Sequence, residues 1–435
     1  MKLGPELYSS QALREMNQRL GPQMDPPTNL KPGGRPTGRV AVIAGLEGKV
    51  SLLQVAQKSL GHIKKWLGEM QGFLENAPDQ EGQLAPSVAN RFVEDRLQQI
   101  GGITEATSFG AKALLNGKSG VLGEADGPGL QFVRGSARVI SSIGRGYPVA
   151  IDESARPASL MGAASVSPSV IAQESWISLK EGGLEARYQV RGDEDPSQLA
   201  QNLQRCIQAA GLDLSVYLTR DQRLLFLHNQ LGGEPRFEGL SQKTRLISAR
   251  PGDPVWATPG RDVLGSIGTE PAQGQGGFLI GAKGNPRTEG LIIYYDGQVD
   301  YPGQVVGYVR VSQSGLLVPL DVAGQEVEIL SLPDLRPKQQ AVGVRNASGF
   351  KSLAQIRAGS PTERRDADLL VQKALGELGQ LSEELRWKEQ VYINKAIDLL
   401  KAGNEFEPKG TELLGLSSDK AQAMAQQLRG MMKSA

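Results

Sequence analysis

The sequence has few of the residue types that most often perform catalysis or bind metals. Its 435 residues include one cysteine, Cys206, and two histidines, His62 and His228. A lone cysteine cannot form a disulfide within this chain, and neither histidine stands at a zinc-ligand spacing such as His-Glu-x-x-His. We interpret both histidines as surface or packing residues, and we expect no metal, no cofactor and no enzyme activity.

The chain also lacks a charge excess and long apolar runs. It carries 48 Lys and Arg residues against 47 Asp and Glu residues, which argues against general electrostatic binding of nucleic acid or of an anionic membrane. No uninterrupted apolar run reaches the ~18 residues of a membrane span, and the first twenty residues contain no apolar core of a Sec-type signal. We expect a soluble protein without membrane insertion, and a leaderless export route remains open.

Several short stretches resemble functional motifs only superficially. In "GGFLIGAKG", Ala282 stands between the glycine and the lysine, and no Ser or Thr follows, so the stretch is not a phosphate-binding loop. The carboxylate runs 193–195 and 383–384 are interpreted as solvated loops and helix faces rather than acid–base pairs. The tripeptide "RGD" at 191–193 is common by chance, and we predict no integrin binding for it.

Apolar residues at alternating spacings of three and four predict long helices near both ends of the chain. At the downstream helix, Thr362 is the expected N-cap and Gly403 the expected end. The expected helical seam consists of Leu53, Leu60, Ile63, Leu67, Met70, Val93, Leu97, Ile100, Leu378, Leu381 and Leu385. We expect these residues to form mainly the intrachain core of an antiparallel or mixed bundle, with the middle of the chain inserted at its far tip.

The resulting fold class is α+β: an elongated helical rod formed by N- and C-terminal segments, with inserted β-rich outer modules. Short strand-like runs separated by Asp-Gly and Pro-Gly turns indicate the β content. The expected domains are an N-terminal arm and Pro/Gly linker (1–38), the N-terminal half of the rod (39–120), a hairpin or connector (121–165), an α+β module (166–250), a β-rich module (251–345), the C-terminal half of the rod (346–403) and a C-terminal arm (404–435).

The stretch "TSFGAKALLNGKSG" follows the second predicted helix and contains no catalytic residue type. Asn116-Gly117 suits a tight turn with positive φ, so we expect a joint there between a helix and a hairpin. Leu114 and Leu115 are expected to pack against the bundle. The residues assigned to this joint are Phe109, Gly110, Leu114, Leu115, Asn116 and Gly117.

The order of these segments resembles the flagellin family. The first helical stretch is similar to the family's "SLLQVAEGAL" helix, and the second ends in a stretch similar to "ATxTxFNGxxLLxG", although Phe109 is followed directly by Gly110. Downstream, "SGFKSLAQI" resembles the "SGFxSLxxI" lead-in to the returning helix. The matching residues are Leu52, Leu53, Gln54, Val55, Ala56, Leu60, Ala106 to Gly110, Leu114 to Gly117, Ser348 to Phe350, Ser352, Leu353 and Ile356.

The resemblance implies an extracellular subunit of the bacterial flagellar filament that self-assembles by helix packing. It also implies export through the flagellar type III pathway without a cleaved signal. The partners would be further copies of the chain or other flagellins, together with the export machinery and a chaperone. The resemblance covers most of residues 40–400 and is strongest at the two helical ends.

The terminal arms depart from the flagellin pattern. Pro32 and Pro36 interrupt the N-terminal arm, and Pro408 interrupts the C-terminal one. A proline within a helix costs about 3 kcal/mol or more. In the family such arms pair as helices and build the inner tube of the filament, so these prolines argue against ordinary tube formation. Two alternatives therefore stay open. One is a flagellar cap or hook–filament junction protein, and the other is a secreted flagellin-derived adhesin that does not polymerise.

Overall fold

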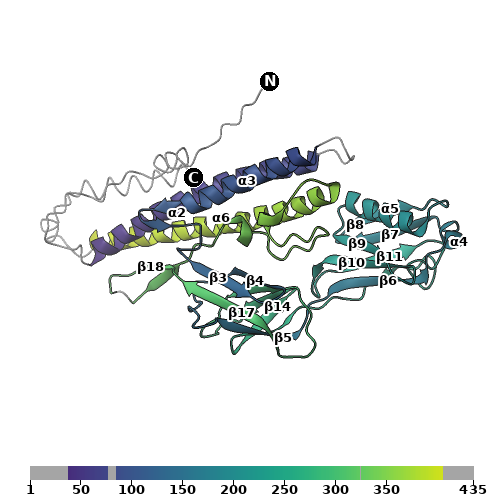
Figure 1. Ribbon diagram of the computed structural model, residues 1–435. Coiled ribbons are helices and arrows are strands. Elements are labelled where there is room, and N and C mark those ends of the chain that lie inside the picture. The colour runs from purple at the N-terminus through teal and green to yellow at the C-terminus, as the bar shows by residue number, and fades with distance from the viewer. Residues whose placement is uncertain (1–37, 77–84, 324, 405–435) are drawn as a thin grey trace, which may run out of the picture. The chain divides into compact units, whose positions relative to one another are not determined.

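The structure is a computed structural model that describes residues 38–76, 85–323 and 325–404. The chain divides into two compact units. One consists of Met1–Leu122, Gln313–Gln340 and Arg357–Ala435, and the other of Gly123–Ser312 and Ala341–Ile356. We call them the helical unit and the β unit (Figure 1). The expected N-terminal arm before Gly38 and the expected C-terminal arm after Asn404 lie outside the described residues.

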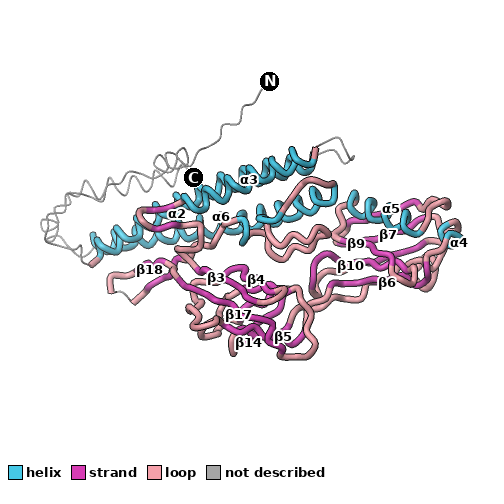
Figure 2. The backbone as a smooth tube through the Cα atoms, in the orientation of Figure 1, coloured by secondary structure: helices cyan, strands magenta, loops and turns pink. Residues whose placement is uncertain are grey.

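The helical unit contains three long helices, α2 (Arg39–Asn76), α3 (Pro86–Ala106) and α6 (Pro361–Asn404). Helix α2 runs antiparallel to α3. Near one end of the pair, Phe73 stacks on Phe92 with ring centroids 4.3 Å apart, and near the other end Thr107 Oγ1 lies 2.9 Å from Ser59 Oγ. The segments nearest the two ends of the described chain, α2 and α6, thus share one unit with α3, as Figures 1 and 2 show.

Helix α2 also runs antiparallel to α6. The Gln54 and Gln57 amides each donate to the Glu389 carboxylate at 2.8 Å, whereas farther along α2 the charge of Glu75 acts on Asp368, earlier in α6. Burial of apolar side chains between antiparallel helices explains why the heptad spacing in the sequence persists over such lengths.

Helix α6 begins with a reciprocal cap. The Glu363 N–H donates to Ser360 Oγ, and the Ser360 N–H donates to the Glu363 carboxylate, both at 3.1 Å. This is a capping box of the Ser-x-x-Glu type, with Pro361 at the first helical position. The N-cap is therefore Ser360, two residues before the expected Thr362, because Ser360 has the glutamate at the required spacing.

Among the described helices, only α2 is long and apolar enough to cross a membrane by length and composition. Its most apolar 18-residue window has a mean hydropathy of 1.2. Many of its apolar side chains are buried in the helical unit, and the core helix of a soluble protein passes the same test. Glu47 and Lys49 interrupt its apolar sequence, and burial raises the pKa of Glu47 and lowers that of Lys49.

Short β elements complete the helical unit. These are two antiparallel pairs, and the second forms a hairpin that contacts α2. A 3₁₀ turn, η1 (Pro337–Gln339), contacts α3. The paired strands are β1 (Ser108–Phe109) with β2 (Lys112–Ala113), and β18 (Leu316–Pro319) with β19 (Val327–Leu330).

The β unit contains an eight-stranded sheet whose described pairings are antiparallel. Its strands come from two regions of the chain more than a hundred residues apart. In spatial order they are β3 (Val121–Asp126), β17 (Gln304–Gln313), β5 (Tyr147–Glu153), β13 (Leu264–Ile267), β14 (Glu270–Gln275), β15 (Phe278–Gly281), β16 (Ile292–Tyr295) and β4 (Leu130–Arg134). A 3₁₀ turn, η2 (Leu353–Gln355), also belongs to this unit.

Between β5 and β13 the chain forms an α+β module with its own core, seen in Figure 2. A three-stranded sheet has the order β6 (Pro157–Ser165), β10 (Arg223–Leu231), β9 (Leu214–Leu218). A four-stranded sheet has the order β12 (Val255–Trp256), β11 (Phe237–Ser241), β7 (Trp176–Glu181), β8 (Leu184–Gln189). Helix α5 (Pro196–Ala209) contributes Leu199, Leu203 and Ile207 to the core, and α4 (Pro168–Ile171) contributes Ile171.

A pair of backbone hydrogen bonds closes the module at its base. Arg156 and Arg261 exchange N–H to carbonyl bonds, both at 2.9 Å. The chain therefore enters and leaves the module at two neighbouring residues, Arg156 and Arg261.

The strand pairing differs from the expected domain limits. The expected connector 121–165 contains β3, β4 and β5 of the eight-stranded sheet and β6 of the module. The sheet also takes strands from the expected β-rich module 251–345. Such pairing joins segments far apart in the chain, and local alternation of apolar residues carries no information about which strands pair.

Candidate functional site

The predicted seam residues lie on the three long helices of the helical unit. Nine of the eleven are buried, and Leu97 and Leu381 are half-buried. The buried members are Leu53, Leu60, Ile63, Leu67, Met70, Val93, Ile100, Leu378 and Leu385. Their side chains contribute to the core of their own unit and do not form an exposed stripe.

The predicted joint has the expected positive φ at Gly117, +81°, and it also contains a tight hairpin whose turn lies before Asn116-Gly117. Strands β1 and β2 pair Phe109 with Lys112, which leaves Gly110 and Ala111 as a two-residue loop. Gly110 has φ +59°, as required at the first central position of a type II′ turn. A glycine directly after Phe109 thus supplies the positive φ that this turn needs.

The two leucines of the joint are fully buried in the helical unit, and the asparagine after them is nearly so. The Asn116 amide donates to a Glu105 carboxylate oxygen of α3 at 2.8 Å, and Asn116 pairs with Asp334 in an antiparallel bridge. Arg336 forms ion pairs with both carboxylates. The guanidinium pKa is raised, chiefly by its hydrogen bond to Asp334. Polar contacts therefore attach the joint both to α3 and to the segment that contains Asp334.

The predicted return segment lies in the β unit. Asn346 fixes it through its side chain, which donates to the Phe350 carbonyl at 2.7 Å and accepts the Phe350 N–H at 2.8 Å. Phe350, Leu353 and Ile356 are buried. Gly349 has φ +75°, a backbone conformation that favours glycine. The Ser-Gly-Phe stretch is thus an anchored loop.

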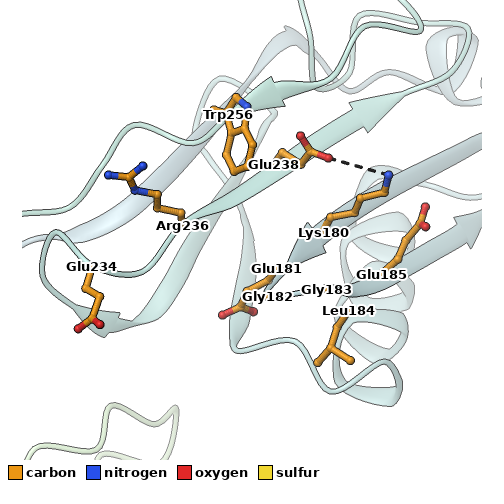
Figure 3. Close-up of a pocket in the computed structure, with 10 residues that line it drawn as sticks. All are labelled: Lys180, Glu181, Gly182, Gly183, Leu184, Glu185, Glu234, Arg236, Glu238 and Trp256. Carbon is orange, nitrogen blue, oxygen red and sulfur yellow. Dashed lines mark ion pairs between the residues drawn. The ribbon is translucent and has the colours of Figure 1, made fainter.

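A shallow, open pocket lies on the four-stranded sheet of the module (Figure 3). One row of cross-strand neighbours runs through it: Glu185 on β8, Lys180 on β7, Glu238 on β11 and Trp256 on β12. Lys180 and Glu238 are 3.9 Å apart as an ion pair. The indole of Trp256 is 65% exposed. The other lining residues are Glu181, Gly182, Gly183, Leu184, Glu234 and Arg236.

Glu181 of this pocket is held by a buried histidine. His228 Nε2 lies 2.6 Å from a Glu181 carboxylate oxygen, and His228 Nδ1 accepts the Gln230 N–H at 2.9 Å. The imidazole therefore donates from Nε2 to the carboxylate. Burial raises the pKa of Glu181, but the bonds from His228 and from the Asp213 N–H outweigh it, and the net pKa is below its usual value.

The contact between His228 and Glu181 joins strands of the two sheets of the module. The residues of the described ranges contain no group of three or more His, Cys, Asp or Glu side chains that could hold a metal ion. Cys206 lies on α5, where burial raises its thiol pKa and so lowers its reactivity. His62, on α2, is 6.2 Å from the Trp66 ring. Sequence reasoning missed the contact between His228 and Glu181, since the two residues lie on strands of different sheets.

No protein-family model matches the chain, and no curated protein matches it. Similar solved structures include the D1-D2-D3 domains of the flagellar cap protein FliD from Escherichia coli, at 11% identity, 66% coverage of this chain, 89% of that chain and a TM-score of 0.33. FliC from Burkholderia pseudomallei has 12% identity, 80% and 99% coverage and a TM-score of 0.25.

Flagellar hook-associated protein-3 from Legionella pneumophila has 10% identity, 91% and 94% coverage and a TM-score of 0.23. All three are flagellar proteins, and all three TM-scores are below 0.5.

Proposed function

We propose that this chain is a structural subunit of the bacterial flagellar filament, a flagellin-like protein that assembles with copies of itself. One observation carries the proposal. The N-terminal stretch that resembles flagellin, on α2 and at the end of α3, is far in the chain from α6, the helix that follows the "SGFKSLAQI" lead-in, yet α2, α3 and α6 belong to the same helical unit. The packing of α6 on α2 supports the proposal, because the resemblance implies a returning helix that pairs with the N-terminal ones.

The properties that follow belong to the same proposal. The subunit would act outside the cell in the flagellum, after export by the flagellar type III machinery with a chaperone. Its partners would be further copies or other flagellins.

The test is assembly of the purified full-length chain, observed by negative-stain electron microscopy. The protein is incubated alone and with sheared filaments of a bacterial flagellin as seeds. Filaments without seeds support a major subunit, and growth only from seeds supports a minor one. If no copies are incorporated under either condition, the filament proposal is wrong and a non-polymerising adhesin takes its place.

A further inference from the structure

The hairpin formed by β18 and β19 has one face fixed to the helical unit. Leu316, Val318 and Leu330 on this inner face are 3% exposed or less, and β18 contacts α2. Two ion pairs tie β19 and the residue before it to α6: Glu328 with Lys388 at 2.5 Å and Glu326 with Lys395 at 2.6 Å.

A buried tyrosine lies beside this attachment. Tyr392 of α6 is 0% exposed, and it lies one helical turn from both lysines, so all three side chains share a helix face. Burial and, after it, the Glu328 carboxylate raise the tyrosine pKa. The hairpin is thus a fixed part of the helical unit, and its outer face has a defined orientation on that unit.

The outer face of the hairpin is apolar and largely exposed. Directly opposite residues of an antiparallel pair lie on one face, and here the outer pairs are Leu317 with Ile329 and Pro319 with Val327. Leu317 is 65% exposed and Val327 is 48% exposed. Val322, in the loop between the strands, is exposed as well. We call Leu317, Pro319, Val322, Val327 and Ile329 the outer patch.

An apolar patch on both strands of a hairpin is unusual for a surface that faces only water. Such a surface normally alternates apolar and polar residues, with the polar ones outward. The β18 edge of this hairpin is less suited to binding than its face, because Pro319 lacks the N–H that an added strand would need. The chemistry of the outer patch therefore favours face packing by another apolar surface.

We infer that the outer patch docks onto a second copy of this chain. The inference rests on the proposed function, because a self-assembling subunit needs surfaces that contact its copies. Charge supports this occupant: Glu326 and Glu328 next to the patch are neutralised by their lysines, so an approaching copy meets no uncompensated charge from them.

The size of the patch also favours a contact repeated in a polymer. Five short side chains bury far less than the roughly 800 Å² per partner of a stable isolated complex. A small contact of this kind is weak between two free copies and becomes effective where several contacts act together. The nine buried seam residues cannot supply such contacts, because their side chains lie within the unit.

The first test asks what lies against residue 317. The double variant Leu317→Cys, Cys206→Ser is labelled with benzophenone maleimide, mixed with an equal amount of ¹⁵N-labelled protein and irradiated under assembly conditions. We expect cross-linked peptides that join light and heavy chains. The matched control is Tyr217→Cys in the same background, since Tyr217 is 51% exposed on a strand of the module.

Cross-links at residue 317 that stay within one chain, or mixed cross-links no more frequent than in the control, overturn the inference. This result would stand even if filaments form, in which case the proposed function survives alone. Conversely, mixed cross-links without any filaments support the docking surface and reject the filament proposal.

The second test is a charge substitution. We expect Leu317→Glu to reduce the pelleted fraction of assembled protein at least tenfold, with an unchanged helical circular dichroism spectrum, while Tyr217→Glu leaves the pelleted fraction unchanged. Equal pelleting of Leu317→Glu and the unsubstituted protein contradicts the inference.

Discussion

Asp368 on α6 is a carboxylate in a poor environment for its charge. Its Oδ2 accepts from the Gln372 amide at 2.7 Å, whereas its Oδ1 is buried without a hydrogen-bond partner in the part of the chain that the structure describes. Burial, followed by the charge of Glu75, raises the pKa of Asp368 to about 6. The folded state therefore binds this proton more tightly than the unfolded chain does.

The sign of the resulting pH effect follows from linkage. A carboxyl whose folded pKa lies above its unfolded value destabilises the fold when ionised, so this penalty is relieved as the pH falls from 7 toward 4. We expect Asp368→Asn to raise the urea midpoint of helix unfolding at pH 7.5 and to have little effect at pH 4. Glu384→Gln, an exposed change on the same helix, is the control; an equal gain at both pH values would contradict the assignment.

The amide of Asn116 gives a second prediction at the scale of one residue. Removing it in Asn116→Ala leaves the nearly buried joint without its bond to Glu105. We expect the free energy of unfolding of the helical unit to fall by about 1–3 kcal/mol, the cost of an unmade buried hydrogen bond. Lys118→Ala, at an exposed position of the same turn, should change it little in a urea titration followed at 222 nm.

At this scale the sequence predicted residue types better than exact positions. It indicated a positive φ at Asn116-Gly117, which Gly117 has, but not the two-residue hairpin turn at Gly110, because strand register and not dipeptide preference selects that loop. It also indicated a cap before α6, but the pairing of Ser360 with Glu363 is decided by reciprocal bonds. Both shifts are small, and both follow from contacts that a residue preference does not include.

Helix α6 provides a matched pair for testing the packing of an element. Leu385 is 1% exposed, whereas Leu381, one turn earlier, is half-buried. We expect Leu385→Ala to lower the free energy of unfolding by about 2–5 kcal/mol, as for buried leucines that leave a cavity, and Leu381→Ala to cost clearly less. Equal losses in thermal or urea unfolding would place the two side chains in equivalent environments and contradict this packing.

The long helices could be predicted from sequence because their signal is local and repeated over many turns. The hairpin of β18 and β19 was harder to interpret, since Leu316 to Leu320 is apolar on both faces and lacks the alternation of a half-exposed strand. Because both faces of β18 are apolar, the sequence did not show which face is buried. The apolar residues of the exposed face belong to the outer patch. The pocket on the module was not predicted at all, as it depends on residues of four strands.

Within the β unit, the connectivity suggests a test on the whole molecule. Arg156 and Arg261 form the kind of hydrogen-bonded pair that flanks a two-residue hairpin loop. We expect replacement of Pro157–Gly260 by Asn-Gly to leave a soluble protein with cooperative thermal unfolding and helical circular dichroism from the three long helices. The experiment measures both properties and the elution volume in gel filtration.

The control deletion removes Leu264–Tyr295 with the same linker. It takes out four consecutive strands of the eight-stranded sheet, so we expect aggregation or loss of cooperative unfolding. If both deletions behave alike, the module is not independent of the sheet. The sequence indicated an α+β module at 166–250, but it did not indicate that the strands on the two sides of the module pair with each other across more than a hundred residues.

The closed base of the module also bears on how such a chain can diverge over generations. Because the module leaves and re-enters at two paired residues, an in-frame insertion, loss or exchange between them preserves the register of the strands outside. Selection can then vary the surface of this segment at a rate independent of the helices, whose buried seam tolerates little change. Lineages related by descent would share the helical ends and differ most between positions 157 and 260.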